Sequence, residues 1–297
     1  MMAHRVDCDI SLGHLLRRSR DRLRASANGT PDLDARLLLL AATGVSHEAF
    51  IADPDRIVSQ EDIERLEGLI DRRLAGEPVS RILGAREFYG RKFALSAATL
   101  DPRPDTETLI DQCLAIVDVM GWRDKSLRLL DVGTGSGAII ITLLAELPHA
   151  SGVATDLEFD ALMMARANAE RLGVGERLSL VQCNWMDTLS CRMDVILSNP
   201  PYIPTNDIAT LSPEVRCHDP LLALDGGLDG LDAYRHLVPS ARDLLNPGGW
   251  VLLETGDGQA DAVSELCGLC GFSAHPEVAP QARDLAGLVR VVSMQLA

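Results

Sequence analysis

Hydrophobic residues recur at helical spacing in the first part of the chain. Residues 11–25 place leucines on one face of a helix, with arginines between them. Two further apolar stretches, 32–42 and 59–74, are each followed closely by a glycine, as helices commonly are. Residues 1–80 are therefore predicted to form a small all-helical bundle.

The pattern changes to strand-like alternation between Val79 and Thr99. This stretch contains Gly84 and Gly90 together with aromatic residues, a composition typical of a β-hairpin. We therefore predict a β-hairpin linker at residues 81–101.

Residues 101–107 (Asp-Pro-Arg-Pro-Asp-Thr-Glu) begin extended because of their two prolines and then start a helix that runs to Met120. Two interpretations of Arg103, Thr106 and Glu107 are open. They face a bound cofactor, or they belong only to the capped start of the helix.

Short apolar strands alternate with helices through the rest of the chain, which predicts a right-handed parallel sheet. The predicted strands are residues 127–132, 151–154, 178–183, 193–198, 250–254, 275–278 and 289–295. The last two are expected to form an antiparallel pair. The prediction is an α/β fold with a seven-stranded Rossmann-like sheet, in which residues 102–297 form one domain.

A glycine-rich turn follows the first of these strands and precedes an apolar helix. Glycines at alternate positions allow the main chain to approach a ligand closely. Their spacing differs from the dinucleotide fingerprint, and no lysine follows them, which excludes a phosphate-binding P-loop. The residues of this turn are Gly133, Thr134, Gly135, Ser136 and Gly137.

Polar or aromatic residues also end the next two strands. Asp156 is placed to accept hydrogen bonds from both hydroxyls of a ribose, or alternatively to cap a helix that starts near Phe159. Asn184 and Trp185 could bracket an adenine ring, although Trp185 could also be an ordinary core residue.

The tetrapeptide at residues 199–202 is suited to the methylation of a planar nitrogen. Such a nitrogen is a poor nucleophile because its lone pair is delocalised, so both of its N–H groups need acceptors. The Asn199 side chain offers one acceptor, and the Pro200 carbonyl, which prolines keep out of a normal ladder, offers a second. Pro201 keeps the chain extended, and Tyr202 supplies a flat wall.

These motifs together resemble the S-adenosylmethionine-dependent methyltransferases, and more narrowly the HemK/PrmC family, the peptide chain release factor glutamine N5-methyltransferases. Further matches to that family are residues 101–107, 218–220, 226–231, 247–249, 254–259 and 284–287. The chain departs from the family pattern at Asp105, where glutamate is usual, and at Asn184, where aspartate is frequent. The resemblance extends over almost the whole chain from Arg81 onward.

The resemblance implies S-adenosylmethionine as cofactor and a class 1 release factor, at the glutamine of its Gly-Gly-Gln motif, as protein substrate. It also implies that the N-terminal bundle helps to grip this substrate; a folding cap is the alternative. Cofactor binding is implied for Gly133, Thr134, Gly135, Ser136, Gly137, Asp156, Asn184, Trp185 and Asn199. Substrate binding is implied for Asn199, Pro200, Pro201 and Tyr202, with Asn199, Pro200 and Tyr202 as catalytic residues.

Two other methyltransferase activities remain as alternatives. A close relative methylates a glutamine of a large-subunit ribosomal protein, but the stretch 103–107 favours the release factor type. Adenine-N6 methyltransferases that act on nucleic acid share the tetrapeptide. The formal net charge of −15 argues against such a target, because a nucleic-acid binder is usually basic.

Composition adds expectations about partners and location. No apolar run is long enough to span a membrane, and Met1-Met2-Ala3-His4-Arg5 lacks the apolar core of a secretory signal. Seven scattered cysteines suggest reduced thiols in the cytoplasm, and Cys267 and Cys270 lack the further ligands of a zinc site. We expect a cytoplasmic monomer without a metal, a membrane or a stable nucleic-acid partner.

Overall fold

The computed structural model describes residues 10–25 and 29–297. It divides into two compact units, residues 1–84 and 85–297. The expectation about a secretory signal concerns Met1 to Arg5, which lie outside the described residues.

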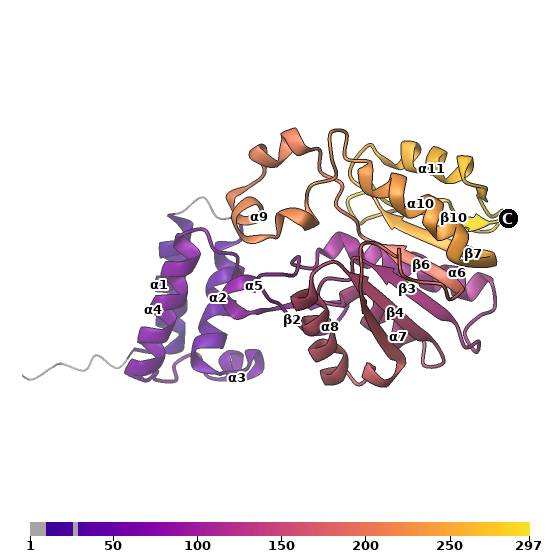
Figure 1. The fold of residues 1–297 in the computed structure, drawn as a ribbon. Coiled ribbons are helices and arrows are strands. Elements are labelled where there is room, and N and C mark those ends of the chain that lie inside the picture. Colours follow the sequence, from indigo (N-terminus) through magenta and orange to yellow (C-terminus); the bar gives the residue numbers. More distant parts are fainter. Residues whose placement is uncertain (1–9, 26–28) are drawn as a thin grey trace, which may run out of the picture. The chain divides into compact units, whose positions relative to one another are not determined.

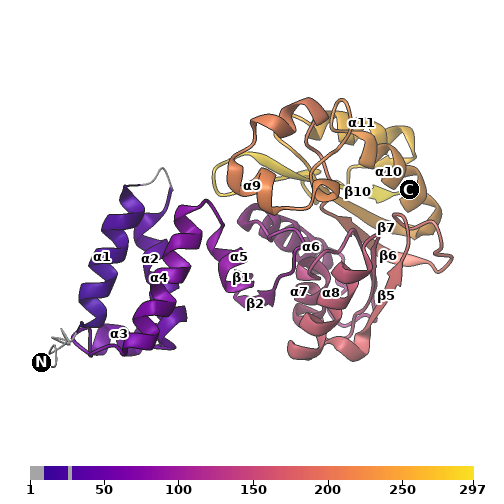
Figure 2. The ribbon, with the colours of Figure 1, turned by 60° about the vertical axis from the view of Figure 1, so that its left-hand side comes forward.

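The first unit consists of helices, as the sequence predicts (Figures 1 and 2). The helices are α1 (Leu12–Arg24), α2 (Pro31–Thr43), α3 (His47–Ala52), α4 (Gln60–Leu74) and α5 (Val79–Leu83). Ser11 caps α1 by accepting a hydrogen bond from the His14 N–H, and Gly44 ends α2 in the left-handed conformation. Leucines of α1, α2 and α4 form the core between them.

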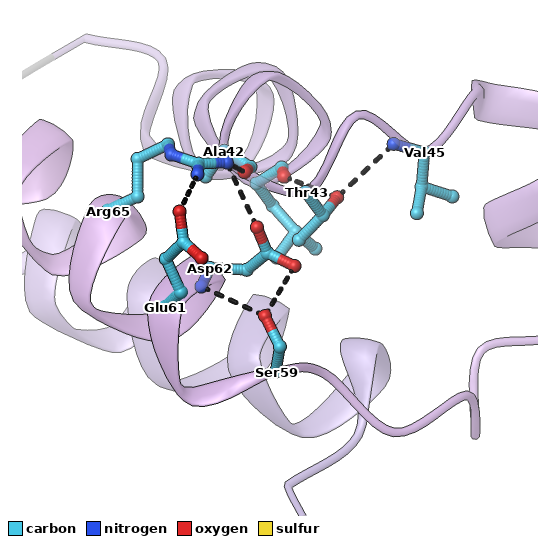
Figure 3. Close-up of polar contacts among 8 residues, drawn as sticks. Ala42, Thr43, Val45, Ser59, Glu61, Asp62 and Arg65 are labelled. Atoms are coloured by element: carbon cyan, nitrogen blue, oxygen red, sulfur yellow. Dashed lines mark hydrogen bonds and ion pairs between the residues drawn. The ribbon is translucent and has the colours of Figure 1, made fainter.

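Arg65 on α4 fastens the end of α2 (Figure 3). Its guanidinium donates to the Ala42 carbonyl at 2.6 Å and to the Asp62 carboxylate at 2.9 Å. Asp62 is itself held by Ser59, the N-cap of α4. A C-terminal carbonyl of one helix is thus satisfied by a cation on its neighbour.

Several arginines of α1 form ion pairs within the bundle. Arg18 and Arg22 donate to Glu67 on α4, and Arg24 donates to Asp32 on α2 at 2.8 Å. These charges therefore stabilise contacts between helices of the unit, each weakly because the groups are partly exposed.

The second unit is built on a mixed sheet in the order β5-β4-β3-β6-β7-β10-β8, with β9 paired to β10 outside this path. The strands are β3 (Arg128–Val132), β4 (Ser151–Asp156), β5 (Leu178–Gln182), β6 (Met193–Ser198), β7 (Leu245–Glu254), β8 (Phe272–Ser273), β9 (Gln281–Arg283) and β10 (Val289–Leu296). The predicted Rossmann-like fold is confirmed. The prediction of a strand at 275–278 was wrong: this stretch is a turn, and the short strands β8 and β9 flank it.

Helices cover both faces of this sheet (Figure 1). On one face α6 (Glu107–Val119), α7 (Ala138–Glu146) and α8 (Phe159–Arg171) pack on Leu129 and Leu197, and on the other α10 (Asp232–Leu244) and α11 (Ala260–Leu269) pack on Leu130 and Val251. Alternate strand residues face opposite layers, as the pleat requires. An insertion between β6 and α10 carries η3 (Thr205–Thr210), α9 (Pro213–His218) and η4 (Leu221–Ala223).

A hairpin of β1 (Ala85–Phe88) and β2 (Arg91–Ala94) opens this unit. The buried Asn168 on α8 exchanges hydrogen bonds with the main chain of Ala94, at 2.8 and 3.0 Å, and donates to the Ser136 carbonyl at 2.9 Å. One side chain thereby joins the hairpin to the glycine-rich turn.

Candidate active site

A cavity of about 290 Å³ opens where β3, β4 and β6 end. This is the edge of the sheet at which open α/β folds bind their ligands. Its wall includes Gly133, Gly135, Thr155, Asp156, Leu157, Asn184, Trp185, Asn199, Pro200, Pro201 and Ala223. Eight of the residues singled out by sequence therefore meet at one cavity; they are Gly133, Gly135, Asp156, Asn184, Trp185, Asn199, Pro200 and Pro201.

The three glycines of the turn all have positive φ angles, 72°, 55° and 82°. Gly133 and Gly135 line the cavity, and an added Cβ at either would meet no atom closer than 4.0 Å. A Cβ at Gly137 would lie 3.2 Å from the Ala165 Cβ, so this glycine permits a close approach of the turn to α8. Thr134 and Ser136 are buried and do not line the cavity.

Asp156 braces the turn from the end of β4. Its carboxylate accepts hydrogen bonds from the Gly135 N–H at 2.9 Å and the Glu158 N–H at 3.0 Å. Burial raises the pKa of Asp156, and these main-chain donors act in the opposite direction. The alternative of a helix cap is not what the structure shows, because Glu158 occupies the N-cap of α8. A carboxylate has about four acceptor positions, so capacity remains for a ligand.

Asn184 and Trp185 lie at the rim of the cavity. Asn184 is exposed and contacts Asp187 at 3.3 Å, and Trp185 takes a φ of 50° while its ring packs partly on the core. Trp185 thus lines the cavity and also contributes to packing, and its contact with an adenine ring stays a prediction.

Asn199 stands between this cavity and a second one of about 190 Å³. The second cavity is lined by Leu100, Arg103, Asn199, Tyr202, Ile203, Leu211, Val215, Ala223 and Leu224. The Asn199 amide donates to the Thr106 hydroxyl oxygen at 3.1 Å. Within the described part of the chain, no hydrogen bond reaches Asn199 Oδ1 or the Pro200 carbonyl oxygen. Two neighbouring acceptors are therefore available, one on Asn199, which lines both cavities, and one on Pro200, which lines the first.

The main chain of the tetrapeptide is held by two glycines and a glutamine. A Cβ at Gly226 would lie 2.8 Å from the Pro201 carbonyl, and one at Gly230 would lie 2.3 Å from the Tyr202 carbonyl. Gln259 donates to that same Tyr202 carbonyl at 2.9 Å. The glycine run at 226–231 thus permits a close approach of two main chains.

Arg103, Thr106 and Glu107 contact other parts of the protein and do not line the first cavity, which contains Asp156. Arg103 pairs with the buried Asp219, Thr106 accepts from Asn199, and Glu107 accepts from the Tyr89 N–H at 2.8 Å. None of the three lines that cavity, so the interpretation that they face a cofactor there is not supported by the geometry.

Glu254 is a further candidate that the sequence did not single out for a role. It ends β7 and is only 2% exposed, and burial raises its pKa to about 7. The hydroxyls of Thr106 and Tyr202 lower that pKa through hydrogen bonding, the former more strongly. A glutamate that ends an apolar strand, after Trp250 to Leu253, is the sequence signal that could have indicated it.

The first cavity fits a nucleoside that carries a sulfonium group. Gly133 and Gly135 leave the turn without side chains, the Asp156 carboxylate offers spare acceptors, and Trp185 offers an aromatic surface. The buried Thr155 hydroxyl on the same wall has no hydrogen-bond partner among the described residues. No group of three or more His, Cys, Asp or Glu side chains in the described ranges is arranged to hold a metal ion.

Comparison with known proteins agrees with this geometry. A family model for the PrmC N-terminal domain matches residues 14–84, and one for the methyltransferase small domain matches residues 109–211. The release factor glutamine methyltransferase of Bradyrhizobium diazoefficiens is 47% identical over 92% of this chain and 90% of its own length. That of Agrobacterium fabrum is 44% identical over 93% and 94%.

Among solved structures, the hMettl16 catalytic domain in complex with a MAT2A 3'UTR hairpin matches with a TM-score of 0.56. It is 17% identical and covers 74% of this chain and 81% of its own, a likeness that concerns the fold alone.

The family models and the curated relatives show that the protein is an S-adenosylmethionine-dependent methyltransferase. Within that class the chain belongs to the release factor glutamine methyltransferase family.

Proposed function

We propose that this protein transfers a methyl group to the N5 nitrogen of the glutamine in the Gly-Gly-Gln motif of class 1 peptide chain release factors. The observation that carries this proposal is the pair of neighbouring unused acceptors, Asn199 Oδ1 and the Pro200 carbonyl, on residues that line the first cavity, with Asn199 also lining the second. A primary amide has two N–H groups, so two acceptors satisfy both of them. The names of the relatives give the substrate class.

The two cavities have different tasks in this proposal. S-adenosylmethionine supplies an electrophilic methyl group when it is bound in the cavity lined by Gly133, Gly135, Asp156, Asn184 and Trp185. The glutamine side chain enters through the second cavity, beside Tyr202, and reaches Pro201 on the wall of the first cavity. Asn199 lines both cavities, so it meets the acceptor nitrogen where the cofactor ends.

The protein contributes orientation and polarisation to the reaction. Asn199 and Pro200 accept the two amide hydrogens, which turns the nitrogen lone pair toward the electrophilic carbon and stabilises the charge that develops on the amide. Tyr202 closes the side of the acceptor cavity, and burial raises the pKa of its hydroxyl, so it stays neutral. No strong base is required, since the nitrogen loses its proton late, to water.

Each part of the chain has its own task in this proposal. We assign residues 1–80 to recognition of the protein substrate, 81–101 to a hairpin connection and 102–297 to catalysis. The net charge of −15 favours a basic protein partner over nucleic acid, mainly through the rate of encounter. Because release factors act in translation, we assign the protein to the cytoplasm. We also assign it as a monomer, because one chain supplies every residue named above.

No described helix is both long and apolar enough to cross a membrane. All six described cysteines are free, and Cys267 and Cys270 pack at the end of α11. Both observations are compatible with this assignment.

The test is transfer of label from tritiated S-adenosylmethionine to release factors of the source organism, beside variants in which Gly-Gly-Gln becomes Gly-Gly-Ala. Label in the natural factor and none in the variant is the expected result. Equal labelling of both would move the target to another residue. Label that appears only in ribosomal protein or nucleic acid would retain the chemistry and overturn the substrate.

A further inference from the structure

Arg103 is the one charged side chain among the described residues that line the second cavity, and the proposed chemistry does not use it. Six of the other lining residues are apolar, and the remaining two are Asn199 and Tyr202. The side chain of Arg103 is 35% exposed, so it reaches the opening of the cavity. A cation on a largely apolar wall indicates an occupant that brings its own hydrogen-bond acceptors.

Two features hold Arg103 in place before any ligand binds. Its main chain lies between Pro102 and Pro104 and is extended, with φ −89° and ψ 144°, the conformation favoured before a proline. Its guanidinium donates from Nη2 to the carboxylate of Asp219, whose side chain is only 2% exposed. Asp219 lies at the end of α9, so the pair joins residues 101–107 to the insertion that forms much of the cavity wall.

The guanidinium keeps donors for a ligand. It has five N–H groups in a rigid fork, and its one hydrogen bond in the described part of the chain uses a single nitrogen, Nη2. The N–H groups on Nε and Nη1 therefore remain available. Because the carboxylate of Asp219 binds one nitrogen of the fork, the directions of these remaining donors are also restricted.

A bound glutamine residue offers two kinds of carbonyl to these donors. One is the side-chain carbonyl of the reacting amide, which carries much of the charge of the delocalised ground state. A hydrogen bond to it would stabilise the ground state more than the transition state, in which the nitrogen lone pair forms the new bond. The other kind is a main-chain carbonyl, which takes no part in the reaction and loses nothing by accepting.

The length of the glutamine side chain brings this second kind of carbonyl near. Only two methylene groups separate the reacting amide from the main chain of the same residue. The second cavity has a volume of about 190 Å³ and is lined by both Asn199 and Arg103. An amide bound at Asn199 therefore places its own main chain in or at the opening of this cavity, which Arg103 reaches.

We propose that Arg103, held by Asp219, donates hydrogen bonds to a main-chain carbonyl of the Gly-Gly-Gln segment. This contact rests on the proposed function and adds to it the group that binds the peptide main chain. Arg103 is then a substrate-binding residue, and Asp219 is a positioning residue because it acts through Arg103. The contact requires no side chain on the substrate, which suits a segment whose first two residues have none.

The first test compares Arg103→Met with the natural protein in steady-state methylation of a release factor. Methionine keeps an unbranched stem and removes every donor. The KM for the release factor is expected to rise roughly 10- to 100-fold, the scale of one hydrogen bond with a charged partner. The kcat should change by less than about threefold, because the bond exists equally before and during transfer. An unchanged KM overturns the proposal.

Release factors with an altered main chain separate contact with the substrate from support of the cavity wall. An ester in place of one main-chain amide weakens the carbonyl at that position as an acceptor, and three such factors cover the two glycines and the glutamine. One of them is expected to lose roughly tenfold in kcat/KM with the natural protein, and less than about twofold with Arg103→Met. Equal losses with the two proteins at all three positions overturn the contact.

Two further variants control for changes in folding. Arg103→Lys keeps a cation for the buried Asp219 but replaces the fork by a single ammonium group, so KM should still rise about tenfold. The ester comparison is made with this variant should Arg103→Met fail to fold. Arg128→Met removes an exposed arginine at the start of β3, at the other end of that strand from the cavities, and should leave KM unchanged. A rise equal to that of Arg103→Met would contradict a specific role for Arg103.

Labelling of the natural release factor separates this contact from the proposed function. Label on its glutamine, together with equal ester losses in both proteins, overturns the contact and leaves the function in place. No label on any release factor overturns the substrate, and the contact with it.

Discussion

The donor half of the site consists mainly of main-chain groups, whereas the acceptor half consists mainly of side chains. The donor half is a short stretch of main chain, Gly133 to Gly137, braced by the Asp156 carboxylate from the neighbouring strand. The acceptor half depends on side chains that converge from distant segments: Thr106 and Asn199 are 93 residues apart, and Glu254 lies on yet another strand.

This difference separates binding from turnover. The donor half is mainly main chain that lines the first cavity, so we expect its residues to affect mainly cofactor affinity. The acceptor half must align the reacting nitrogen with the methyl group, so we expect its residues to affect mainly the rate of transfer. A donor-half substitution that lowers mainly kcat, or an acceptor-half substitution that lowers mainly cofactor affinity, would contradict this division.

The largest effect is expected for Asn199→Ala, with a loss of roughly 10² to 10³ in kcat, the scale of removing one preorganised polar partner. Steady-state methylation of a release factor measures it, and Asn246→Ala is a control on the same sheet, far from the tetrapeptide in sequence. Turnover like that of the natural protein in Asn199→Ala would remove this residue from the acceptor role.

The next effect is a dependence of stability on pH that Glu254 causes. Because its pKa rises from 4.5 to about 7 on folding, the folded state holds a proton that the unfolded state loses first. This stabilisation is complete below 4.5 and is lost as the pH rises to about 7.

Denaturation by urea at several pH values measures this contribution. The free energy of unfolding of the natural protein should fall, relative to Glu254→Gln, by about 3 kcal/mol between pH 4 and pH 8. Burial also raises the pKa of Asp131 to about 7, but Asp131 is present in both proteins, so its contribution cancels. A difference independent of pH would show that Glu254 does not titrate in this range.

A smaller effect is expected for Asp156→Ala in the donor half. Loss of a charged acceptor should weaken S-adenosylmethionine binding roughly 10- to 100-fold, measured by calorimetry. With saturating cofactor, kcat should change by less than about fivefold. An unchanged affinity would refute the ribose role, and a large loss in kcat alone would assign Asp156 to the acceptor half.

The smallest effect is expected for Asn184→Ala. This side chain is exposed at the rim and donates a long hydrogen bond to Asp187, at 3.3 Å, so cofactor affinity should change by less than about threefold. Calorimetry beside Asp156→Ala gives the comparison directly. A loss as large as that of Asp156→Ala would make Asn184 a principal contact with the cofactor.

The parts of this architecture that sequence could predict are those that depend on neighbouring residues. Helical periodicity gave α1, α2 and α4, and the glycine spacing gave a strand, a turn and a helix in succession. The positions of the tetrapeptide and Asp156 follow from the rule that parallel strands end at one edge of a sheet.

Contacts between residues far apart in the sequence could not be predicted in this way. The partners of Arg103 and Glu107, which are Asp219 and the Tyr89 main chain, cannot be read from a local pattern, so both were assigned a cofactor-facing alternative. The predicted strand at 275–278 failed for a related reason, since β10 pairs with β7 and leaves only short partners beyond it. The roles of individual site residues stay predictions.

The hydrogen bonds of Asn168 limit where recombination can exchange the N-terminal module of this protein during evolution. Its side chain joins the main chain of Ala94 to the carbonyl of Ser136, so the hairpin travels with the turn that it supports. A recombination event that joins a new N-terminal module at Gly84 keeps all of these bonds. One that joins it at Pro102 discards Ala94 and leaves the buried amide of Asn168 without two of its partners. Modules can therefore be exchanged before the hairpin at lower cost than after it.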